Sequence, residues 1–284
     1  MVIVLLNSLE FLWDHTLVFV GNNQFLTEEI ILSGKLIELG SMTRPHNRKH
    51  DELRPLTFIP DFAKNADGSV LVELGNTKVL ITAMIDEKVP PFLDGTNKGW
   101  LTAEYSLLPG STRPRSTREA TRGRPSGRTS EIQRLIGRSL RAAFNLNLIG
   151  PRTITIDADV INADASTRVA SICGGYVALY KALSKLKEKK IITSVPVIEP
   201  VSAVSVGVVK GELLLDLDYS EDSKAEIDCN VVMNKSGKLI ELQMTAEGKP
   251  FSQELVNDIL KLAQKGINEI TEKQIKITEL APVC

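Results

Sequence analysis

The sequence of 284 residues predicts an α/β fold, with mixed sheets, for one large body. Runs that alternate apolar and polar residues, typical of strands, recur between Gly68 and Met244. Apolar residues at helical spacing predict three helices, at 130–143, 169–187 and 251–270. Hydrophobic residues make up 43% of the chain and charged residues 24%, which is ordinary for a soluble globular protein.

Residues 1–41 differ from the rest of the chain. A secretory signal would carry early positive charge, yet the first 34 residues contain neither Lys nor Arg. A membrane span would need about twenty uninterrupted apolar residues, and Glu10 and Asp14 interrupt the run. We expect either a poorly ordered N-terminal extension or, preferably, translated sequence upstream of a start at Met42. The folded domain is then 42–284, with no membrane partner.

The first predicted strands form a hairpin, 69–74 and 78–83, around the turn Gly75-Asn76. A strand at 100–107 follows, and then a loop from Pro109 to Gly127 that is rich in Pro, Gly, Ser and Thr. The sequence Ser130-Glu-Ile-Gln133 fits a capping box, which predicts a helix that begins at Ser130.

The second part of the chain predicts further strands and two helices. Its strands are expected at 153–161, 203–209, 212–218, 227–233 and 239–244. The pair Gly174-Gly175 in the helix 169–187 permits close packing, and 219–226 is expected to be an acidic loop. The blocks 68–143 and 153 onward are candidates for two structural halves.

Nine arginines and no lysine lie between Pro109 and Arg141, although the net charge of the chain is only −1. Arginine used to the exclusion of lysine indicates planar, bidentate recognition of phosphate. The loop arginines are either a solvated charged loop or an electrostatic rail along an RNA backbone. Arg128 lies at the start of a helix, where the helix dipole disfavours a cation, so an anion is expected there.

The segment Asp164–Arg168 ends a predicted strand and opens a predicted helix, so free backbone N–H groups there favour an anion. Ser166 and Thr167 add hydroxyl donors, and Arg168 adds a guanidinium group. Plain helix capping with a surface arginine remains the alternative. Either way, this segment is the clearest anion site in the sequence.

Seven acids and a single lysine lie between Glu212 and Asp228. Asp216 and Asp218 are expected to share one strand face, with Glu221 and Asp222 folding back towards them. Such a cluster binds Mg²⁺, or holds an acid of raised pKa beside an ionised one. An exposed acidic hairpin is the alternative. Together with the arginines, the cluster favours phosphoryl chemistry.

The scarce residue types narrow the chemistry further. All three histidines lie within the first 50 residues, which excludes Ser-His-Asp and Cys-His catalysis unless the N-terminal segment folds into the site. The three cysteines are scattered and without the spacing of a disulfide framework or zinc site. They indicate a reducing compartment, and we therefore expect a cytoplasmic protein.

Taken together, these segments resemble the ribonuclease PH family from about Arg44 to Lys273. The resemblance is carried by long stretches, namely Gly68–Ile81, Gly99–Arg113, Ser126–Phe144, Thr153–Val169, Leu214–Met233 and Glu241–Gln253. It implies a ribonuclease PH-type domain with two βαβα-like halves. It also implies a phosphate-dependent 3′→5′ exoribonuclease, or tRNA nucleotidyltransferase. Such enzymes use inorganic phosphate as co-substrate, trim the 3′ ends of tRNA precursors and other RNA, and assemble as homo-hexamers (trimers of dimers).

The resemblance assigns roles by position. Arg128 matches the family's phosphate-binding arginine, and Ser166, Thr167 and Arg168 match its Gly-Thr-Arg phosphate loop. Asp216 and Asp222 match acids that assist catalysis, through Mg²⁺ or as a general acid. Arg115 and Arg118 match loop arginines that guide RNA.

The chain departs from the family pattern in two places. Ala165-Ser166 replaces the usual Gly-Gly, so the loop must shift or strain if either position needs a positive φ. Gly110 stands where many members carry an arginine, so that RNA contact is missing or is supplied by Arg113.

Two rival functions remain. One is a catalytically silent RNA-binding subunit of an exosome-like ring, a class that usually loses the phosphate arginines or the acidic pair. The other is a metal-dependent hydrolytic nuclease, which is disfavoured because the predicted site is rich in phosphate ligands.

Overall fold

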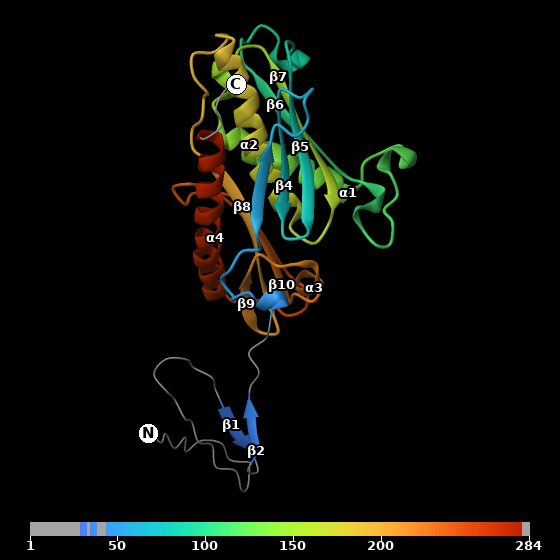
Figure 1. The fold of residues 1–284 in the computed structure, drawn as a ribbon, viewed down its shortest axis with the longest axis vertical. Helices are drawn as coiled ribbons and strands as arrows, with labels where there is room; N and C mark the ends of the chain where they lie inside the picture. The colour runs from blue at the N-terminus through green and yellow to red at the C-terminus, as the bar shows by residue number, and fades with distance from the viewer. Residues whose placement is uncertain (1–28, 33–34, 39–43, 280–284) are drawn as a thin grey trace. The chain divides into compact units, whose positions relative to one another are not determined.

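The computed structural model describes residues 29–32, 35–38 and 44–279, apart from the side chains of 29–38 and Arg122 (Figure 1). Residues up to Lys49 and residues from His50 onward form separate units, and each is described by itself. In the first unit, strands β1 (Glu29–Leu32) and β2 (Lys35–Glu38) pair antiparallel, and η1 (Pro45–Asn47) is a short 3₁₀ helix. The prediction for residues 1–41 lies largely outside the described residues and stays a prediction.

The second unit contains a five-stranded sheet in the order β3-β4-β5-β7-β6. Its strands are β3 (Leu56–Pro60), β4 (Gly68–Leu74), β5 (Thr77–Asp86), β6 (Trp100–Leu107) and β7 (Thr153–Asn162). Only β6 and β7 are parallel neighbours, and the other pairs in this sheet are antiparallel. The predicted hairpin around Gly75-Asn76 and the predicted strand at 100–107 are confirmed.

The proposed division of the chain between 143 and 153 is wrong. Strand β7 pairs with both β5 and β6, so it completes the first sheet instead of opening a second half. The alternating apolar residues Ile154, Ile156 and Val160 of β7 are fully buried in the core of that sheet. The boundary between the sheets therefore follows helix α2 (Thr167–Glu188).

The second sheet has four strands in the order β11-β10-β8-β9, all antiparallel. They are β8 (Val201–Val209), β9 (Glu212–Leu215), β10 (Ile227–Asn234) and β11 (Leu239–Ala246), which confirms that strands form at all four positions predicted between 203 and 244. The prediction that Asp216 and Asp218 share a strand face is wrong. Strand β9 ends at Leu215 because Asp216 adopts a φ of 52°, which turns the chain out of the extended conformation.

The remaining helices are α1 (Gly127–Ala143), α3 (Tyr219–Asp222) and α4 (Gln253–Glu279). Helix α1 begins before Ser130 because Ser126 is its N-cap, with Ser126 Oγ accepting a hydrogen bond from Thr129 N at 3.1 Å. Helix α4 continues past the predicted end at Ile270. Its later polar residues are buried in part, and the Gln274 amide donates to Cys173 O and Val201 O, so the apolar pattern alone understated its length.

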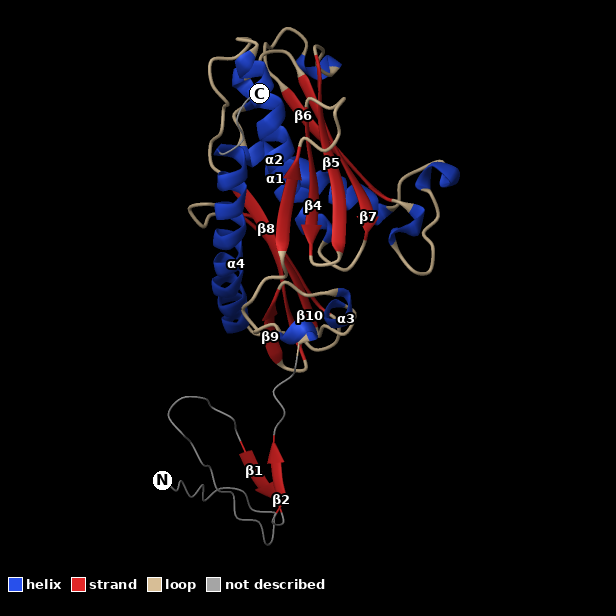
Figure 2. Cartoon of the chain, in the orientation of Figure 1, coloured by secondary structure: helices blue, strands red, loops and turns tan. Residues whose placement is uncertain are grey.

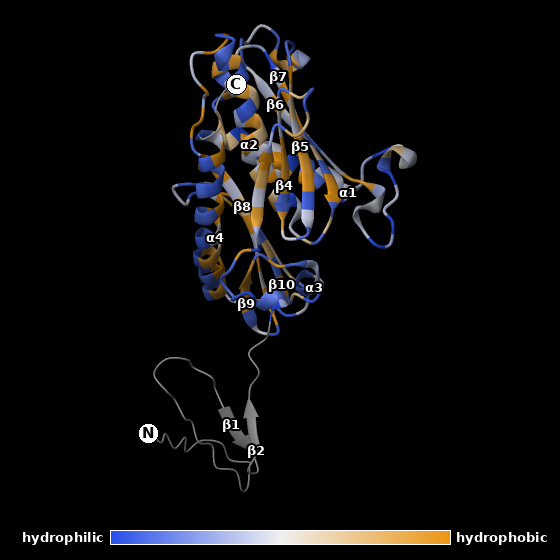
Figure 3. Ribbon diagram, in the orientation of Figure 1, coloured by the Kyte–Doolittle hydropathy of each residue, from blue (hydrophilic) through white to orange (hydrophobic). Residues whose placement is uncertain are grey.

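Helices cover one face of each sheet (Figure 2). Helices α1 and α2 pack on the five-stranded sheet, and α4 packs on β8 and against α2. A Cβ at Gly174 would lie 2.4 Å from Val72 Cγ2, so the predicted close packing through this glycine is confirmed. Figure 3 shows apolar residues concentrated on the sheets, while α4 carries many hydrophilic residues on its visible surface. Among the described helices, none is long and apolar enough to cross a membrane.

Candidate active site

A pocket of about 460 Å³ brings together most of the predicted site residues. It is bounded by the first turns of α1 and α2, by α3, and by side chains from β6, β8 and β10. The predicted residues that line it are Arg113, Arg128, Ser166, Thr167, Arg168 and Asp222. The other three, Arg115, Arg118 and Asp216, do not line it.

The segment before α2 is held in a conformation that L-residues rarely adopt. Ala165 has a φ of 58° and Ser166 a φ of 52°, both in the left-handed region. These are the two positions at which the sequence predicts strain, and a positive φ is present at both. Each costs roughly 1–2 kcal/mol relative to a right-handed conformation, and the surrounding structure must offset this.

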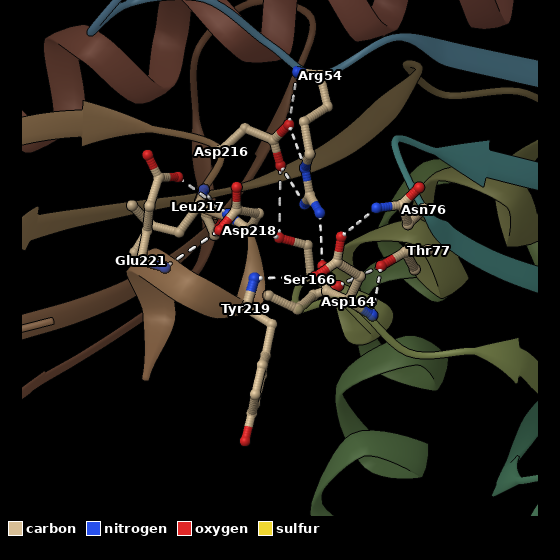
Figure 4. Close-up of polar contacts among 12 residues, drawn as sticks. Arg54, Asn76, Thr77, Asp164, Ser166, Asp216, Leu217, Asp218, Tyr219 and Glu221 are labelled. Atoms are coloured by element: carbon tan, nitrogen blue, oxygen red, sulfur yellow. Dashed lines mark hydrogen bonds and ion pairs between the residues drawn. The ribbon is translucent and has the colours of Figure 1, made fainter. Parts of the chain in front are cut away.

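Hydrogen bonds around Asp164 hold this strained segment (Figure 4). Asp164 N donates to Thr77 Oγ1 (3.0 Å), and Thr77 Oγ1 donates to Ala165 O (2.7 Å). The Asp164 carboxylate accepts from Asn76 Nδ2 and from Tyr219 N, each at 3.1 Å. The segment is thus tied to the β4–β5 turn on one side and to α3 on the other.

Arg54 and Asp216 form a buried ion pair behind the same segment. Arg54 Nη2 and Nε donate to the two carboxylate oxygens of Asp216 at 2.7 and 3.0 Å, and Arg54 N donates at 2.8 Å. Arg54 Nη1 also donates to Asp164 O at 2.5 Å. Burial alone would lower the pKa of Arg54, but the charge and hydrogen bonds of Asp216, together with the charges of Asp164 and Asp218, outweigh burial and raise it.

Asp216 therefore does not line the pocket itself but supports the lining residue Ser166. Its Oδ1 lies 3.4 Å from Ser166 Oγ, and the residue is fully buried. No local sequence pattern indicates a role for Arg54, because its partner Asp216 lies 162 residues away.

Helix α2 begins at the strained segment without a side-chain cap. Ser166 is the N-cap residue, but its hydroxyl bonds to Ser205 Oγ at 2.9 Å instead of to the helix. The hydroxyl of Thr167 contacts the buried Tyr105 phenol at 2.8 Å, and burial raises the pKa of Tyr105. The positive end of a long helix, with backbone N–H groups that lack a side-chain acceptor, thus borders the pocket.

Two arginines face the pocket from different helices. Arg128, on the first turn of α1, is exposed, and Arg168, on the first turn of α2, is largely buried. Arg168 Nη1 donates to Glu131 Oε1 at 3.1 Å and to Gln243 Oε1, and Gln243 Nε2 donates to Glu131 Oε1 at 3.2 Å. Glu131 and Gln243 therefore orient Arg168, a role that sequence analysis missed for both.

The acidic cluster divides into separate roles. Asp218 Oδ1 accepts from Ser220 N and Glu221 N, and Glu221 Oε2 accepts from Asp218 N, so this pair forms the capping box of α3. Asp222 instead faces the pocket together with Asp228 of β10. Burial raises the pKa of both, Asp222 raises that of Asp228 further, and Arg128 and Arg168 act in the opposite direction on both.

Mg²⁺ was predicted at Asp216 and Asp222, and the two carboxylates differ in their fit. Both oxygens of Asp216 accept hydrogen bonds from Arg54, so this carboxylate is already matched to a cation. Asp222 and Asp228 face the open pocket. Mg²⁺ characteristically takes one or two carboxylates together with waters and phosphate oxygens, and this pair fits that pattern. Over the described residues, no cluster of three or more His, Cys, Asp or Glu is suited to a metal.

The arginine-rich segment contributes Arg113 to the pocket wall, while Arg115 and Arg118 are exposed on the loop beyond it. Figure 1 shows this loop, with its short 3₁₀ turns η3 (Pro109–Ser111) and η4 (Glu119–Arg122), projecting from the sheet beside α1. Farther along α1, Arg138 pairs with Glu241 of β11, and Arg141 donates to Leu101 O at 3.0 Å.

Comparison with known proteins places these features in a family. The family model "3′ exoribonuclease family, domain 1" matches residues 52–184, and "3′ exoribonuclease family, domain 2" matches residues 199–266. The break between them coincides with the boundary after α2.

Two curated relatives cover most of the chain. Ribonuclease PH of Syntrophomonas wolfei is 54% identical over 233 residues, which is 82% of this chain and 98% of the relative. Ribonuclease PH of Bacillus velezensis is 52% identical over 235 residues, 82% of this chain and 96% of the relative.

Solved structures share the fold at low sequence identity. An Archaeoglobus fulgidus exosome with RNA bound to the active site matches with a TM-score of 0.71 and 20% identity, over 82% of this chain and 92% of that one. Rice (Oryza sativa) Rrp46 matches with a TM-score of 0.65 and 17% identity, over 84% of this chain and 99% of that one.

Proposed function

Because the chain belongs to the 3′ exoribonuclease family and is 52–54% identical to two ribonuclease PH proteins, we propose that the pocket between α1, α2 and α3 is the active site. The chain is a phosphate-dependent 3′→5′ exoribonuclease that trims tRNA and, in reverse, a nucleotidyltransferase. The observation that carries the assignment of the site is the convergence of Arg128, Arg168, the α2 N-terminus and Asp222 on one pocket.

Inorganic phosphate binds at the phosphate-loop end of this pocket. Arg128 and Arg168 supply guanidinium groups, and Thr167, Ser166 and the first N–H groups of α2 supply neutral donors. Arg168 is held by Glu131 and Gln243, so little side-chain entropy remains to be lost when phosphate binds. The bound phosphate attacks the phosphorus of the last phosphodiester bond of the RNA. The two arginines stabilise the charge that develops on the equatorial oxygens of that phosphorus.

The leaving 3′ oxygen needs a proton, and Asp222 is the acid placed to carry it. Its pKa is raised by burial, which keeps more of the protonated form available than an ordinary carboxyl group would. Asp216 takes a different part in catalysis, because its carboxylate holds Arg54 and lies against Ser166. It positions the phosphate loop.

The pair Asp222 and Asp228 is also where Mg²⁺ would be held. A bound Mg²⁺ would neutralise charge on the phosphate oxygens. Since Asp222 raises the pKa of Asp228, the pair favours a positive partner, either a proton or a cation.

The RNA approaches along the arginine-rich loop, with Arg113 at the pocket wall and Arg115 and Arg118 farther out. Its substrates are tRNA precursors and other RNA 3′ ends. The functional assembly is a homo-hexamer, a trimer of dimers, in the cytoplasm. The likeness to the Archaeoglobus fulgidus exosome chain and to rice Rrp46, at 17–20% identity, supports the fold alone, and the hexamer is a proposal.

One assay separates this function from its rivals. A 3′-extended tRNA precursor is incubated with and without inorganic phosphate, and the released nucleotides are identified. Nucleoside diphosphates that form only with phosphate are the expected result. Monophosphates formed without phosphate would indicate a hydrolytic nuclease, and an unchanged RNA would indicate a silent ring subunit.

A further inference from the structure

Tyr219 presents an exposed aromatic face inside the phosphate pocket. It lines the pocket with Arg128, Arg168 and Asp222, and 62% of its surface is exposed. The other aromatic residue in the pocket lining, Tyr105, is buried and uses its phenol to contact Thr167. Tyr219 therefore offers the aromatic surface on which a flat part of the substrate can be buried.

The backbone of Tyr219 is fixed relative to the phosphate loop. Its N–H donates to Asp164 Oδ1 at 3.1 Å, and it is the first residue of α3, which the Asp218–Glu221 capping box closes. Figure 4 shows these bonds on the backbone side, while the ring extends away from the network. Only two side-chain torsions remain to be ordered on binding, which keeps the entropic cost of a contact low.

The lining of the pocket combines two kinds of chemistry. The guanidinium groups and hydroxyls of Arg128, Arg168, Ser166 and Thr167 match phosphate oxygens, whereas the ring of Tyr219 matches an apolar, planar group. In a nucleotide these two kinds of group are joined through a ribose. Every base has a π face, so stacking on tyrosine holds a base without reading its identity, as an exonuclease of varied 3′ ends requires.

On the premise of the proposed function, we propose that Tyr219 is the stacking platform for the base at the 3′ end of the RNA. The contact is through the ring faces. The phenol hydroxyl is not needed for it, and neither is a second copy of the chain.

The test follows RNA binding and turnover separately. An RNA with 2-aminopurine as its 3′-terminal base is bound without phosphate, and stacking is read from the quenching of its fluorescence. In the wild type the fluorescence falls on binding, and in Tyr219→Ala and Tyr219→Leu this quenching is lost. The KM for RNA rises on the order of 10-fold in Tyr219→Ala, while the KM for phosphate stays within about twofold.

The variants Tyr219→Phe and Phe62→Ala complete the comparison. Phenylalanine keeps the ring, so it restores quenching and the KM for RNA. Phe62 is exposed outside the pocket, so its loss changes neither quantity. If Tyr219→Phe shows the same lost quenching and raised KM for RNA as Tyr219→Ala, the effect belongs to the hydroxyl group and not to the ring. Unchanged quenching in Tyr219→Ala would contradict the proposed stacking. A change in native mass that parallels the lost affinity would place Tyr219 in a subunit interface instead.

These outcomes are separable from a failure of the proposed function. If the wild type releases no nucleoside diphosphates with phosphate present, the phosphorolytic assignment fails. The 2-aminopurine signal still decides, on its own, whether the 3′ base stacks on Tyr219.

Discussion

Ala165 and Ser166 are consecutive residues that both carry a local conformational cost. Both stand in the left-handed region, where glycine would be unstrained, and both belong to the segment that opens α2. The neighbouring bonds of Thr77 and Asp164 keep the segment in place despite this cost. The geometry of the segment that opens α2 is thus retained through its surroundings.

Ala165→Gly is expected to raise the free energy of unfolding by about 1 kcal/mol, because glycine removes the left-handed penalty and loses no hydrogen-bonding side chain. The same substitution at Ala142, an exposed residue within α1, is expected to lower it by about 1 kcal/mol. Urea denaturation of the two variants measures the difference. If Ala165→Gly and Ala142→Gly destabilise the protein equally, backbone strain at Ala165 is contradicted.

Arg168 is expected to be essential to the rate. Arg168→Ala removes one preorganised donor to the phosphate oxygens, and a loss on the order of 10²–10³-fold in kcat/KM follows. Arg134→Ala is the matched control, since it removes an exposed arginine of α1 outside the pocket. Phosphorolysis by Arg168→Ala at the full wild-type rate would refute the assignment.

Asp222 is expected to make Mg²⁺ binding in the pocket depend on pH. Burial raises its pKa, so protons compete with Mg²⁺ for its carboxylate at a higher pH than for an ordinary aspartate. Mg²⁺ binding, measured by calorimetry without RNA, is expected to weaken as the pH falls through this raised pKa. In Asp222→Asn the binding is expected to be lost, while Asp258→Asn, which changes an exposed acid of α4, leaves it intact. Binding that is independent of both pH and Asp222 would place the cation elsewhere.

At the scale of elements, the arginine-rich loop and helix α1 form one continuous segment with two parts. Its loop half exposes Arg115 and Arg118 beyond the pocket, and its helical half ties Arg138 to β11 and Arg141 to β6. Nine arginines in the sequence thus do not form one uniform surface. Two of them, Arg113 and Arg128, line the pocket from this segment.

The loop arginines are expected to act through the RNA backbone. Arg115→Ala and Arg118→Ala should raise the KM for RNA. If the replaced arginine contacts one phosphate, the slope of log KM for RNA against log salt concentration should fall by about 0.7 in each variant. The KM for inorganic phosphate should stay unchanged. Kinetics at several salt concentrations measure the slopes, and an unaltered slope in both variants would leave the loop as a solvated surface.

At the scale of the whole molecule, the site depends on the contact between the two sheets. Arg168 comes from the helix that covers the first sheet, and Gln243 comes from β11 of the second. Arg54 precedes β3 in the first sheet, and Asp216 follows β9 in the second. Any relative movement of the sheets would disturb both arginines, so the buried ion pair and the Glu131–Gln243 contact keep the pocket in one arrangement.

The assembly is expected to be a hexamer. Native mass spectrometry should give six times the mass of one chain, because the resemblance to the ribonuclease PH family implies a trimer of dimers. The same measurement reports whether residues 1–41 are present in the protein isolated from its own cells. A monomeric mass at working concentration would contradict the ring.

The sequence by itself determined the elements and the motif positions. Alternation and turn residues predicted the hairpin around Gly75-Asn76, the strand at 100–107 and the hydrophobic parts of the helices, because these features depend on neighbours a few residues apart. The motifs around Arg128, Asp164–Arg168 and Asp222 predicted two arginines, two hydroxyl groups and one carboxyl group of the pocket wall for the same reason, since each motif lies at an element boundary.

Only the tertiary structure decided which side chains meet. The place of β7 between β5 and β6 depends on pairing with strands from distant parts of the chain. The partners Arg54 and Asp216 are 162 residues apart, and Arg168 and Gln243 are 75 apart. No local pattern encodes such contacts, because they are fixed by the path of the whole chain between them. That path made Asp216 a support of the segment that opens α2 and left Asp222 facing the pocket.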